Sequence, residues 1–279
     1  MLLVPLSVFV GICASAIGMT AWPLIVPLLF VFSGFNIYLT LFISLLMDCG
    51  NALVMMLVAG QHKLVDIRLG LRLAGFALIW IAAGILAGTF FIPAHEEMFR
   101  GAAGVISILF GIAFLIKGLR ARCRRLKEGV AAAPEMACFE THRRGLNVYR
   151  SSLIYPAVAG LGFQIGLFGI GGGMWHSVFL MAFLGYPTLA ATGTAMLITF
   201  ISTFFAACGM FFNIPAGVLD NLLLIQLIPL IVAMSMLGTQ MGAKISYALS
   251  EEYINYLIGV VVIVAGLAAT LQKALLQSL

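Results

Sequence analysis

Long apolar stretches alternate with short polar connections along the whole chain. Eight stretches can be counted, each long enough to cross a hydrocarbon core of about 30 Å as an α-helix. Their approximate limits are 4–32, 36–60, 70–92, 99–118, 152–184, 187–212, 220–243 and 253–272. The short alternating segments typical of a transmembrane β-barrel are absent from the sequence. The pattern predicts an all-α polytopic membrane protein with about eight transmembrane helices.

The composition agrees with this prediction and excludes several other classes. The chain is 63% hydrophobic and 9% charged, whereas soluble domains carry about 25% charged residues. The segment from Met1 to Val10 has no basic part, so we interpret it as the start of the first span and not as a cleaved signal. The five cysteines are scattered, with no Cys-x-x-Cys motif or histidine pair. We therefore expect no disulfide framework, no metal and no cofactor.

Basic residues are concentrated in one connection. Nine of the fifteen Lys and Arg lie between Lys117 and Arg150. Nucleic-acid binding is one interpretation, but in a membrane protein the positive-inside rule explains the run, and we expect no nucleic-acid partner. The chain then divides into a first transmembrane repeat (1–118), a basic cytoplasmic loop (119–151) and a second repeat (152–279). With eight single crossings of the cell (inner) membrane, both termini are cytoplasmic as well.

The charges of the second half fit these eight crossings less well than those of the first. Arg68 and Arg72 fall on the cytoplasmic side, as the rule expects. Lys244 falls outside, and the connection at Asn213 falls inside without any Lys or Arg.

Glycine and proline positions indicate an internal duplication. At an offset of 151 residues, and farther on at 154, the following positions coincide: Pro5 and Pro156, Gly11 and Gly162, Gly18 and Gly169, Gly34 and Gly185, Gly84 and Gly238, Gly88 and Gly242. Duplication is the usual construction of secondary transporters, which hold substrate near the repeat interface. Four crossings per half would make the repeats parallel, and a segment that turns back on itself would allow inverted repeats.

The apolar stretch 152–184 contains five glycines within residues 166–173. Each glycine costs about 0.5–1 kcal/mol relative to alanine inside a helix, so the run predicts a broken helix in the second repeat. In lipid, unwound backbone is tolerated only where protein covers it or where it lines a cavity. Its freed N–H groups could bind an anion. Close helix packing is the alternative, but it explains three contiguous glycines poorly. The substrate-binding candidates in the break are Gly169, Gly171, Gly172 and Gly173.

Polar side chains near the break are further candidates for substrate binding. Gln164 and His176 flank the glycines, and an intramembrane polar residue is costly unless it is hydrogen-bonded. His176 could bind an anion, exchange a proton, or simply bond a freed carbonyl. Thr192, Thr194 and Thr199 could donate hydroxyls to the oxygens of a ligand, or could bond to the preceding turn of their own helix.

Asp48 is the only acidic residue well inside a predicted span. Ser44, Asp48 and Asn51 share one helix face, and at the same offset Thr199 and Ser202 occupy the matching positions of the second half. Because an intramembrane carboxyl group is functional by default, we expect these three first-half residues to serve proton coupling or gating. A structural, hydrogen-bonded carboxyl is the alternative.

The first-half counterpart of the glycine run has a different composition. Thr20-Ala21-Trp22 aligns with Gly171-Gly172-Gly173 and is followed by Pro23 and Pro27. Proline can interrupt a helix where glycine does not. We expect a second, weaker break here, and two half-sites that are not equivalent.

The segments Gly169-Ile-Gly-Gly-Gly, Gly185-Tyr-Pro, Ala190-Ala-Thr-Gly-Thr and Gly238-Thr-Gln-Met-Gly-Ala resemble the sulfite exporter TauE/SafE family of membrane transporters. The resemblance implies a small duplicated transporter of about eight spans. It also implies sulfite, sulfonates or other sulfur-containing or organic anions as substrates, often exported. Most members of this family have a glycine-rich run in both halves, and this chain departs from that pattern at Thr20-Ala21-Trp22.

These observations together predict a secondary transporter, not an enzyme. We expect ion-coupled export of a small anion, sulfite or an organosulfonate first, by alternating access within the lipid bilayer. A membrane enzyme is disfavoured because Asp48 and His176 are the only intramembrane acid or base candidates. A passive anion channel and a non-transporting assembly subunit stay open as alternatives, as does a homo-oligomer.

Overall fold

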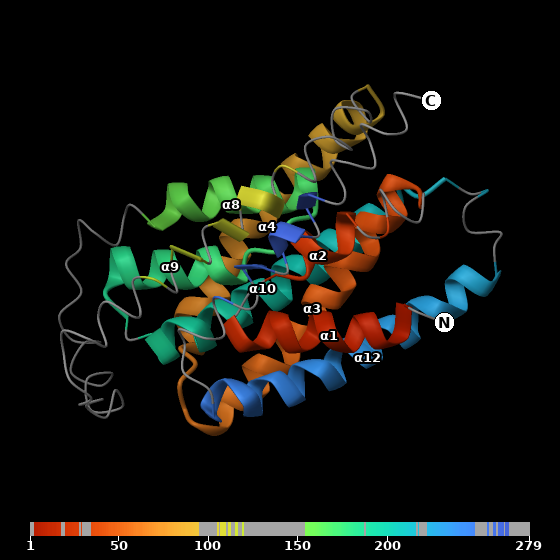
Figure 1. The fold of residues 1–279 in the computed structure, drawn as a ribbon. Helices are drawn as coiled ribbons and strands as arrows, with labels where there is room; N and C mark the ends of the chain where they lie inside the picture. The colour runs from red at the N-terminus through yellow and green to blue at the C-terminus, as the bar shows by residue number, and fades with distance from the viewer. Residues whose placement is uncertain are drawn as a thin grey trace.

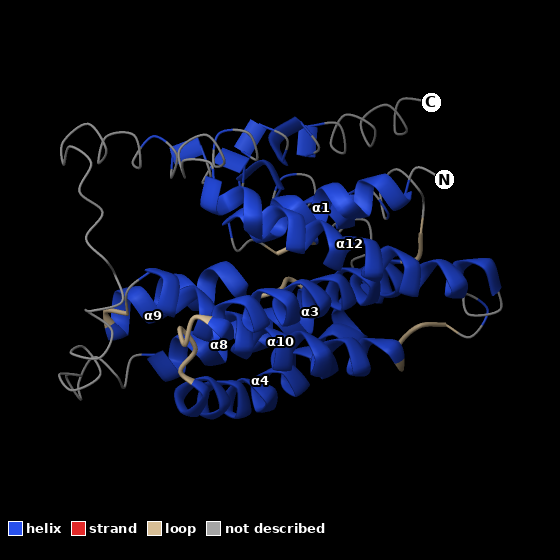
Figure 2. Ribbon diagram, turned by 90° about the horizontal axis from the view of Figure 1, so that it is seen from below, coloured by secondary structure: helices blue, strands red, loops and turns tan. Residues whose placement is uncertain are grey.

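The computed structural model is helical and contains no strand within the residues that it describes (Figure 2). These residues are 3–17, 20–27, 29, 35–94, 154–186, 188–215, 217 and 222–248, with shorter pieces between 105 and 119 and between 256 and 267. The labelled helices in Figure 1 are α1 (Leu3–Ile17), α2 (Trp22–Val26), α3 (Ile37–Gln61), α4 (Ile67–Ala94), α8 (Ile154–Phe168), α9 (Gly173–Leu184), α10 (Thr188–Phe211) and α12 (Leu222–Ala248).

Four of the described helices, α3, α4, α10 and α12, are long and apolar enough to cross a membrane. Their outward faces carry large apolar side chains, and Phe90 on α4 is 80% exposed. Faces of this kind are stable against lipid and unstable against water. The prediction of an all-α membrane protein is therefore confirmed. The basic loop 119–151 lies outside the described residues, as does much of the predicted spans 99–118 and 253–272.

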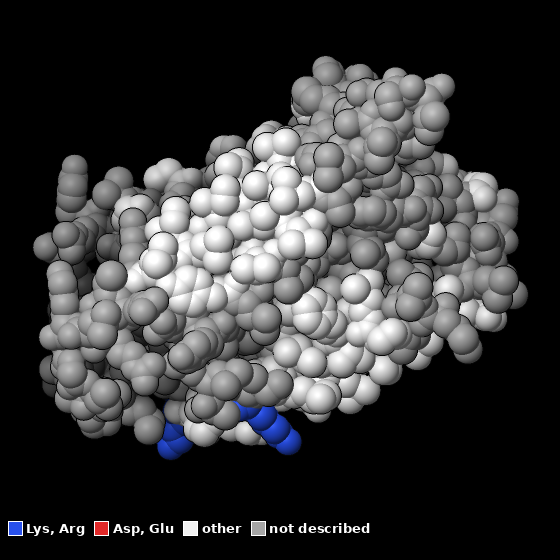
Figure 3. All heavy atoms as spheres, in the orientation of Figure 1, with Lys and Arg blue, Asp and Glu red and all other residues white. Residues whose placement is uncertain are grey.

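All described Lys and Arg side chains lie at one end of the helices. Lys63, Arg68 and Arg72 belong to the connection from α3 to α4 and to the first turns of α4, and all are exposed. Lys244, near the end of α12, lines a surface groove together with Gln61 at the end of α3. Figure 3 shows Lys and Arg gathered at one edge of the visible face. We call this edge of the molecule the basic end.

The predicted break in the second half is present. Helix α8 ends at Phe168 and α9 begins at Gly173, with Gly169 between them at φ +65°. This left-handed conformation favours glycine because a Cβ would meet the backbone. The first half is broken as well, since α1 ends at Ile17 and α2 begins at Trp22. The expectation that proline contributes to this first-half break is supported by Pro23, which lies in the first turn of α2.

The segment α8–α9 turns back on itself instead of crossing. Tyr155 at the start of α8 stacks edge-on with Phe76 of α4, with ring centroids 5.3 Å apart. Tyr186, just after α9, donates a hydrogen bond of 3.1 Å to Asp66, which precedes α4. The segment therefore starts and finishes at the basic end. Helix α8 has 15 residues and is about 22 Å long, shorter than a hydrocarbon core of about 30 Å.

The longest buried helices of the two halves, α3 and α10, are antiparallel. Near the start of α3, Phe42 packs against Phe211 at the end of α10, with ring centroids 5.6 Å apart. Near the other end, Gly193 lies against Ala59. The pair fills the centre of the fold, between the outer helices (Figure 1).

Helices α1 and α12 pack closely on the α3 side and run in the same direction. Val8 meets Gly238, and Ile12 meets Gly242 farther along both helices. A Cβ at Gly11 or Gly238 would overlap a carbonyl oxygen of the partner helix. Small residues are what lets two membrane helices come this close.

Helices α4 and α8 form a matching parallel crossing on the α10 side. Ala77 meets Gly162, and Ile81 meets Gly166 one turn later. A Cβ at Gly84 would overlap the Phe163 carbonyl oxygen, so this crossing also depends on glycine.

Replacement of Gly84 by leucine is expected to destabilise the protein by about 1–3 kcal/mol or more, because α4 and α8 must separate. Gly75→Leu on the same helix is the matched control, since nothing lies within 4 Å of a Cβ at Gly75. Thermal unfolding of the two purified variants in detergent measures the difference. Equal midpoints would contradict the close packing at Gly84.

Candidate functional site

The two helix breaks meet at the carboxyl group of Asp48, near the middle of α3. Asp48 Oδ1 accepts a hydrogen bond of 2.5 Å from the backbone N–H of Ala21, in the first-half break. On the other side, Gly171 lies so close that a Cβ there would overlap the Asp48 carboxylate. A second link joins the breaks, because Trp22 Nε1 donates to the Phe168 carbonyl at 3.0 Å.

The glycine run is explained by what surrounds each position. Gly169 has a positive φ, and Gly171 leaves room for the Asp48 carboxylate. A Cβ at Gly172 would overlap the imidazole ring of His176. Helix packing alone does not require this arrangement. The contiguous glycines let an acidic and an imidazole side chain touch the backbone at adjacent residues.

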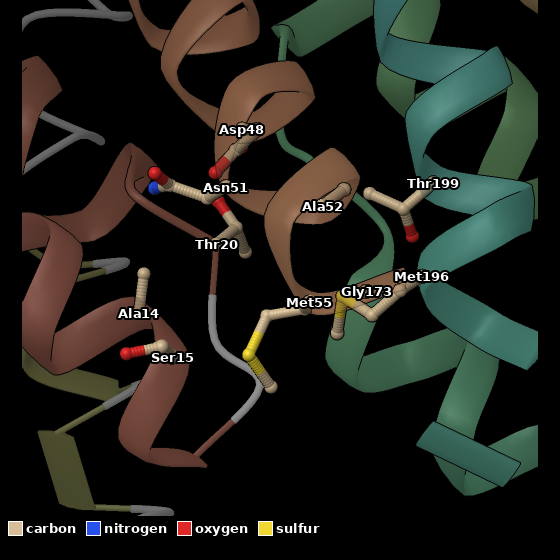
Figure 4. Close-up of a pocket in the computed structure, with 10 residues that line it drawn as sticks. All are labelled: Ala14, Ser15, Thr20, Asp48, Asn51, Ala52, Met55, Gly173, Met196 and Thr199. Atoms are coloured by element: carbon tan, nitrogen blue, oxygen red, sulfur yellow. The ribbon is translucent and has the colours of Figure 1, made fainter. Parts of the chain in front are cut away.

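A narrow polar pocket opens beside this contact (Figure 4). It accommodates about one water molecule. Its lining residues are Ala14, Ser15, Thr20, Asp48, Asn51, Ala52, Met55, Gly173, Met196 and Thr199. Figure 4 shows Ala14, Ser15 and Thr20 on one side of α3, and Met196 and Thr199 on the other. The pocket thus lies between the two halves.

Several buried polar atoms around the pocket make no hydrogen bond within the described part of the chain. They are Asp48 Oδ2, Asn51 Nδ2, His176 Nε2 and the hydroxyls of Ser44 and Ser202. Leaving a buried polar group unpaired costs about 1–3 kcal/mol. Their concentration in one region indicates a site that a polar ligand or water completes.

Some of the site residues predicted from the sequence lie in or beside the pocket. Asp48, Asn51, Gly173 and Thr199 line it directly. His176 stands behind Thr199, with Nδ1 3.3 Å from the Thr199 hydroxyl. Helix α9 also begins here without a side-chain cap, and the positive end of its helix dipole favours negative charge.

Other candidates lie elsewhere, and their roles stay predictions. Gln164 is half-buried on α8 and does not line the pocket. Thr194, two residues after Thr192, accepts a hydrogen bond of 3.0 Å from the Asp66 N–H at the basic end. Together with the Tyr186–Asp66 bond, this contact ties the α3–α4 connection to the start of α10.

Two residues that contribute to the site were missing from the predicted set. Ser235 and Thr239 on α12 both donate hydrogen bonds to Asn51 Oδ1, at 2.9 and 2.8 Å. The signal for them was present, because two hydroxyls at i and i+4 share one face of the apolar stretch 220–243. Their partner on α3 could not be read from that spacing.

Gly171→Ala is expected to abolish ligand binding at this site and to lower stability by about 1–3 kcal/mol, because the new Cβ displaces the Asp48 carboxylate. Gly160→Ala on α8 is the control, since a Cβ there meets nothing within 4 Å. It should leave stability unchanged or raise it by up to about 1 kcal/mol. Anion binding and thermal unfolding of both variants test the expectation, and two variants that behave alike would refute it.

Comparison with known proteins gives one result for this chain. Residues 3–269 match the family model described as Sulfite exporter TauE/SafE. No curated protein and no solved structure matches. The match spans both helix breaks and every residue that lines the pocket.

Proposed function

Because the chain belongs to the sulfite exporter TauE/SafE family, a family of membrane transporters, we propose that it is a secondary transporter that exports a small anion. Sulfite and organosulfonates are the first candidates, because the family description names sulfite.

The observation that carries this proposal is the meeting of two helix breaks at a buried carboxyl group inside a polar pocket. Broken helices with ligand-facing ends near the midplane are the usual binding sites of secondary transporters. The unpaired donor Asn51 Nδ2 and the positive end of the α9 helix dipole suit an anion.

We propose further that the two halves are inverted repeats. Exchanging the halves pairs α1 with α8, α3 with α10 and α4 with α12. The α1–α12 crossing then corresponds to the α8–α4 crossing, because α1 is paired with α8 and α12 with α4. The exchange also reverses direction, because α3 and α10 are antiparallel. Gly11 and Gly162, which coincide at the 151-residue offset, occupy equivalent places in the two crossings.

This arrangement implies a different membrane topology from eight single crossings. Each broken segment enters and leaves on one side, so α10 ends and α12 begins on the side opposite the basic end. Lys244 then joins Arg68 and Arg72 inside, and the connection at Asn213, which lacks Lys and Arg, lies outside. The positive-inside rule is satisfied in both halves, which supports the hairpins. The start of α1 is then placed outside, not in the cytoplasm as single crossings require.

Single cysteines in a variant without the five native ones test this topology. Lys244→Cys is expected to react with a membrane-impermeant maleimide from the cytoplasmic side, and Phe212→Cys from the outside. Both native side chains are exposed in the structure. Arg68→Cys is the control, because both topologies place it inside. Eight single crossings predict the reverse result for Lys244→Cys and Phe212→Cys.

We assign Asp48 the coupling of proton and anion movement. An ionised carboxylate repels an anion in the same pocket, whereas a protonated one can donate a hydrogen bond from Oδ2. Anion binding therefore requires a proton on Asp48, and release of the anion lets the proton leave. The Ala21 N–H holds the other oxygen in place in both states.

Asp48→Asn mimics the protonated carboxyl, since the amide keeps an acceptor for Ala21 and offers a donor at the Oδ2 position. It is expected to retain anion binding and exchange, and to lose their dependence on pH. Asp48→Leu should lose binding altogether. Proteoliposomes loaded with sulfite or with an alkyl sulfonate provide the assay, because the charge of the sulfonate does not change near neutral pH.

The outcomes separate the parts of the proposal. If the native protein moves none of these anions, with or without a proton gradient, the transport function is wrong. If it moves them and Asp48→Asn keeps the native pH dependence, the coupling role of Asp48 is wrong. Currents far above carrier turnover would favour a channel.

A further inference from the structure

One side of the pocket carries a side-chain amide whose orientation is fixed by two hydroxyls. Asn51 is 5% exposed on α3 and lies on the same helix face as Asp48. Its Oδ1 accepts from Ser235 at 2.9 Å and from Thr239 at 2.8 Å, both on α12. An amide oxygen has two lone pairs, so these two bonds use its full accepting capacity.

These two bonds determine which atom of the Asn51 amide is left for a ligand. With Oδ1 held by α12, Nδ2 is the atom left without a partner. In this orientation both hydroxyls donate to Oδ1, and the Thr239 hydroxyl also lies 3.3 Å from the Gly11 carbonyl oxygen. The end of Asn51 that is left for a ligand is then the NH₂ group, which can only donate.

The arrangement occurs beside the α1–α12 crossing and has no counterpart beside the α4–α8 crossing. At the 154-residue offset, the positions that correspond to Ser235 and Thr239 are Ile81 and Ile85, and at the 151-residue offset Asn51 corresponds to Ser202. Two isoleucines cannot orient an amide, so no equivalent donor is built beside α4. The two crossings thus share their close backbone packing, but only α12 contributes hydroxyls that orient an amide on α3.

We propose that Asn51, oriented by Ser235 and Thr239, is the specificity-determining donor of the site and recognises an oxygen atom of an oxyanion. The proposal rests on the proposed transport function. A directional N–H favours a ligand with localised oxygen lone pairs over a spherical halide of the same charge. Ser235 and Thr239 are positioning residues and do not touch the ligand. The preference for an oxyanion over a halide depends on Ser235 and Thr239 more than the overall affinity for anions does.

Asn51→Asp tests the donor itself. The carboxylate retains an acceptor for both α12 hydroxyls, so the fold is kept, but it replaces the donating NH₂ with an oxygen. Binding of methanesulfonate to the purified protein should weaken by at least roughly 10- to 100-fold, because a hydrogen bond to a charged group is lost and the new carboxylate also repels the anion. An unchanged affinity would overturn the proposal.

The double variant Ser235→Ala with Thr239→Val tests the orientation without adding charge. It should reduce the preference for methanesulfonate over chloride several-fold, because the amide is then free to turn its oxygen toward the ligand. Thr40→Val is the control, a buried hydroxyl of α3 that bonds only to Asn36 of its own helix cap. A preference equal to that of the native protein would overturn the inference. Absence of any anion binding by the native protein would instead refute the proposed function.

Discussion

The contact between the Asp48 carboxyl group and two interrupted backbones is the constraint on which the arrangement of the helices depends. One break supplies the Ala21 N–H, and the other brings Gly171 within touching distance. A carboxyl group in the middle of a membrane is costly unless it meets polar groups, and intact helices offer none, because their N–H groups are already bonded. In the structure both breaks reach α3 at the same residue, Asp48.

The glycines outside the breaks also hold the broken segments in place, by allowing close packing between helices. The α1–α12 and α4–α8 crossings bring backbones into direct contact, so each hairpin arm is held by a long helix of the other half. The antiparallel pair α3 and α10 fills the space between these two crossings. Because each crossing joins one half to the other, movement of one half against the other would slide α1 along α12 and α8 along α4. That is the kind of motion by which a central pocket can face either side.

The apolar pattern predicted α3, α4, α10 and α12 closely, because burial in lipid sets the length of a helix directly. The glycine run predicted the break in 152–184, since three contiguous glycines conflict with a helix wherever they occur. The return of the chain was left open as an alternative, although its length offered a clue: about 33 residues exceed one crossing, and each arm falls short of one. Pairings such as Asp48 with Ala21, or Asn51 with Ser235, depend on tertiary register, which no spacing within one helix encodes.

The difference between the two breaks follows from what each must hold. Asp48 and His176 press against Gly171 and Gly172, where no side chain fits. At the first-half break, Ala21 offers its N–H outward to Oδ1, and Trp22 spans the gap to Phe168 with its indole. A side chain is useful there, so Thr20-Ala21-Trp22 replaces glycines without loss of the interruption. The two breaks therefore differ in sequence because they differ in role. The second-half break leaves space for the side chains of Asp48 and His176, and the first-half break supplies the hydrogen bonds from Ala21 and Trp22 that join the halves.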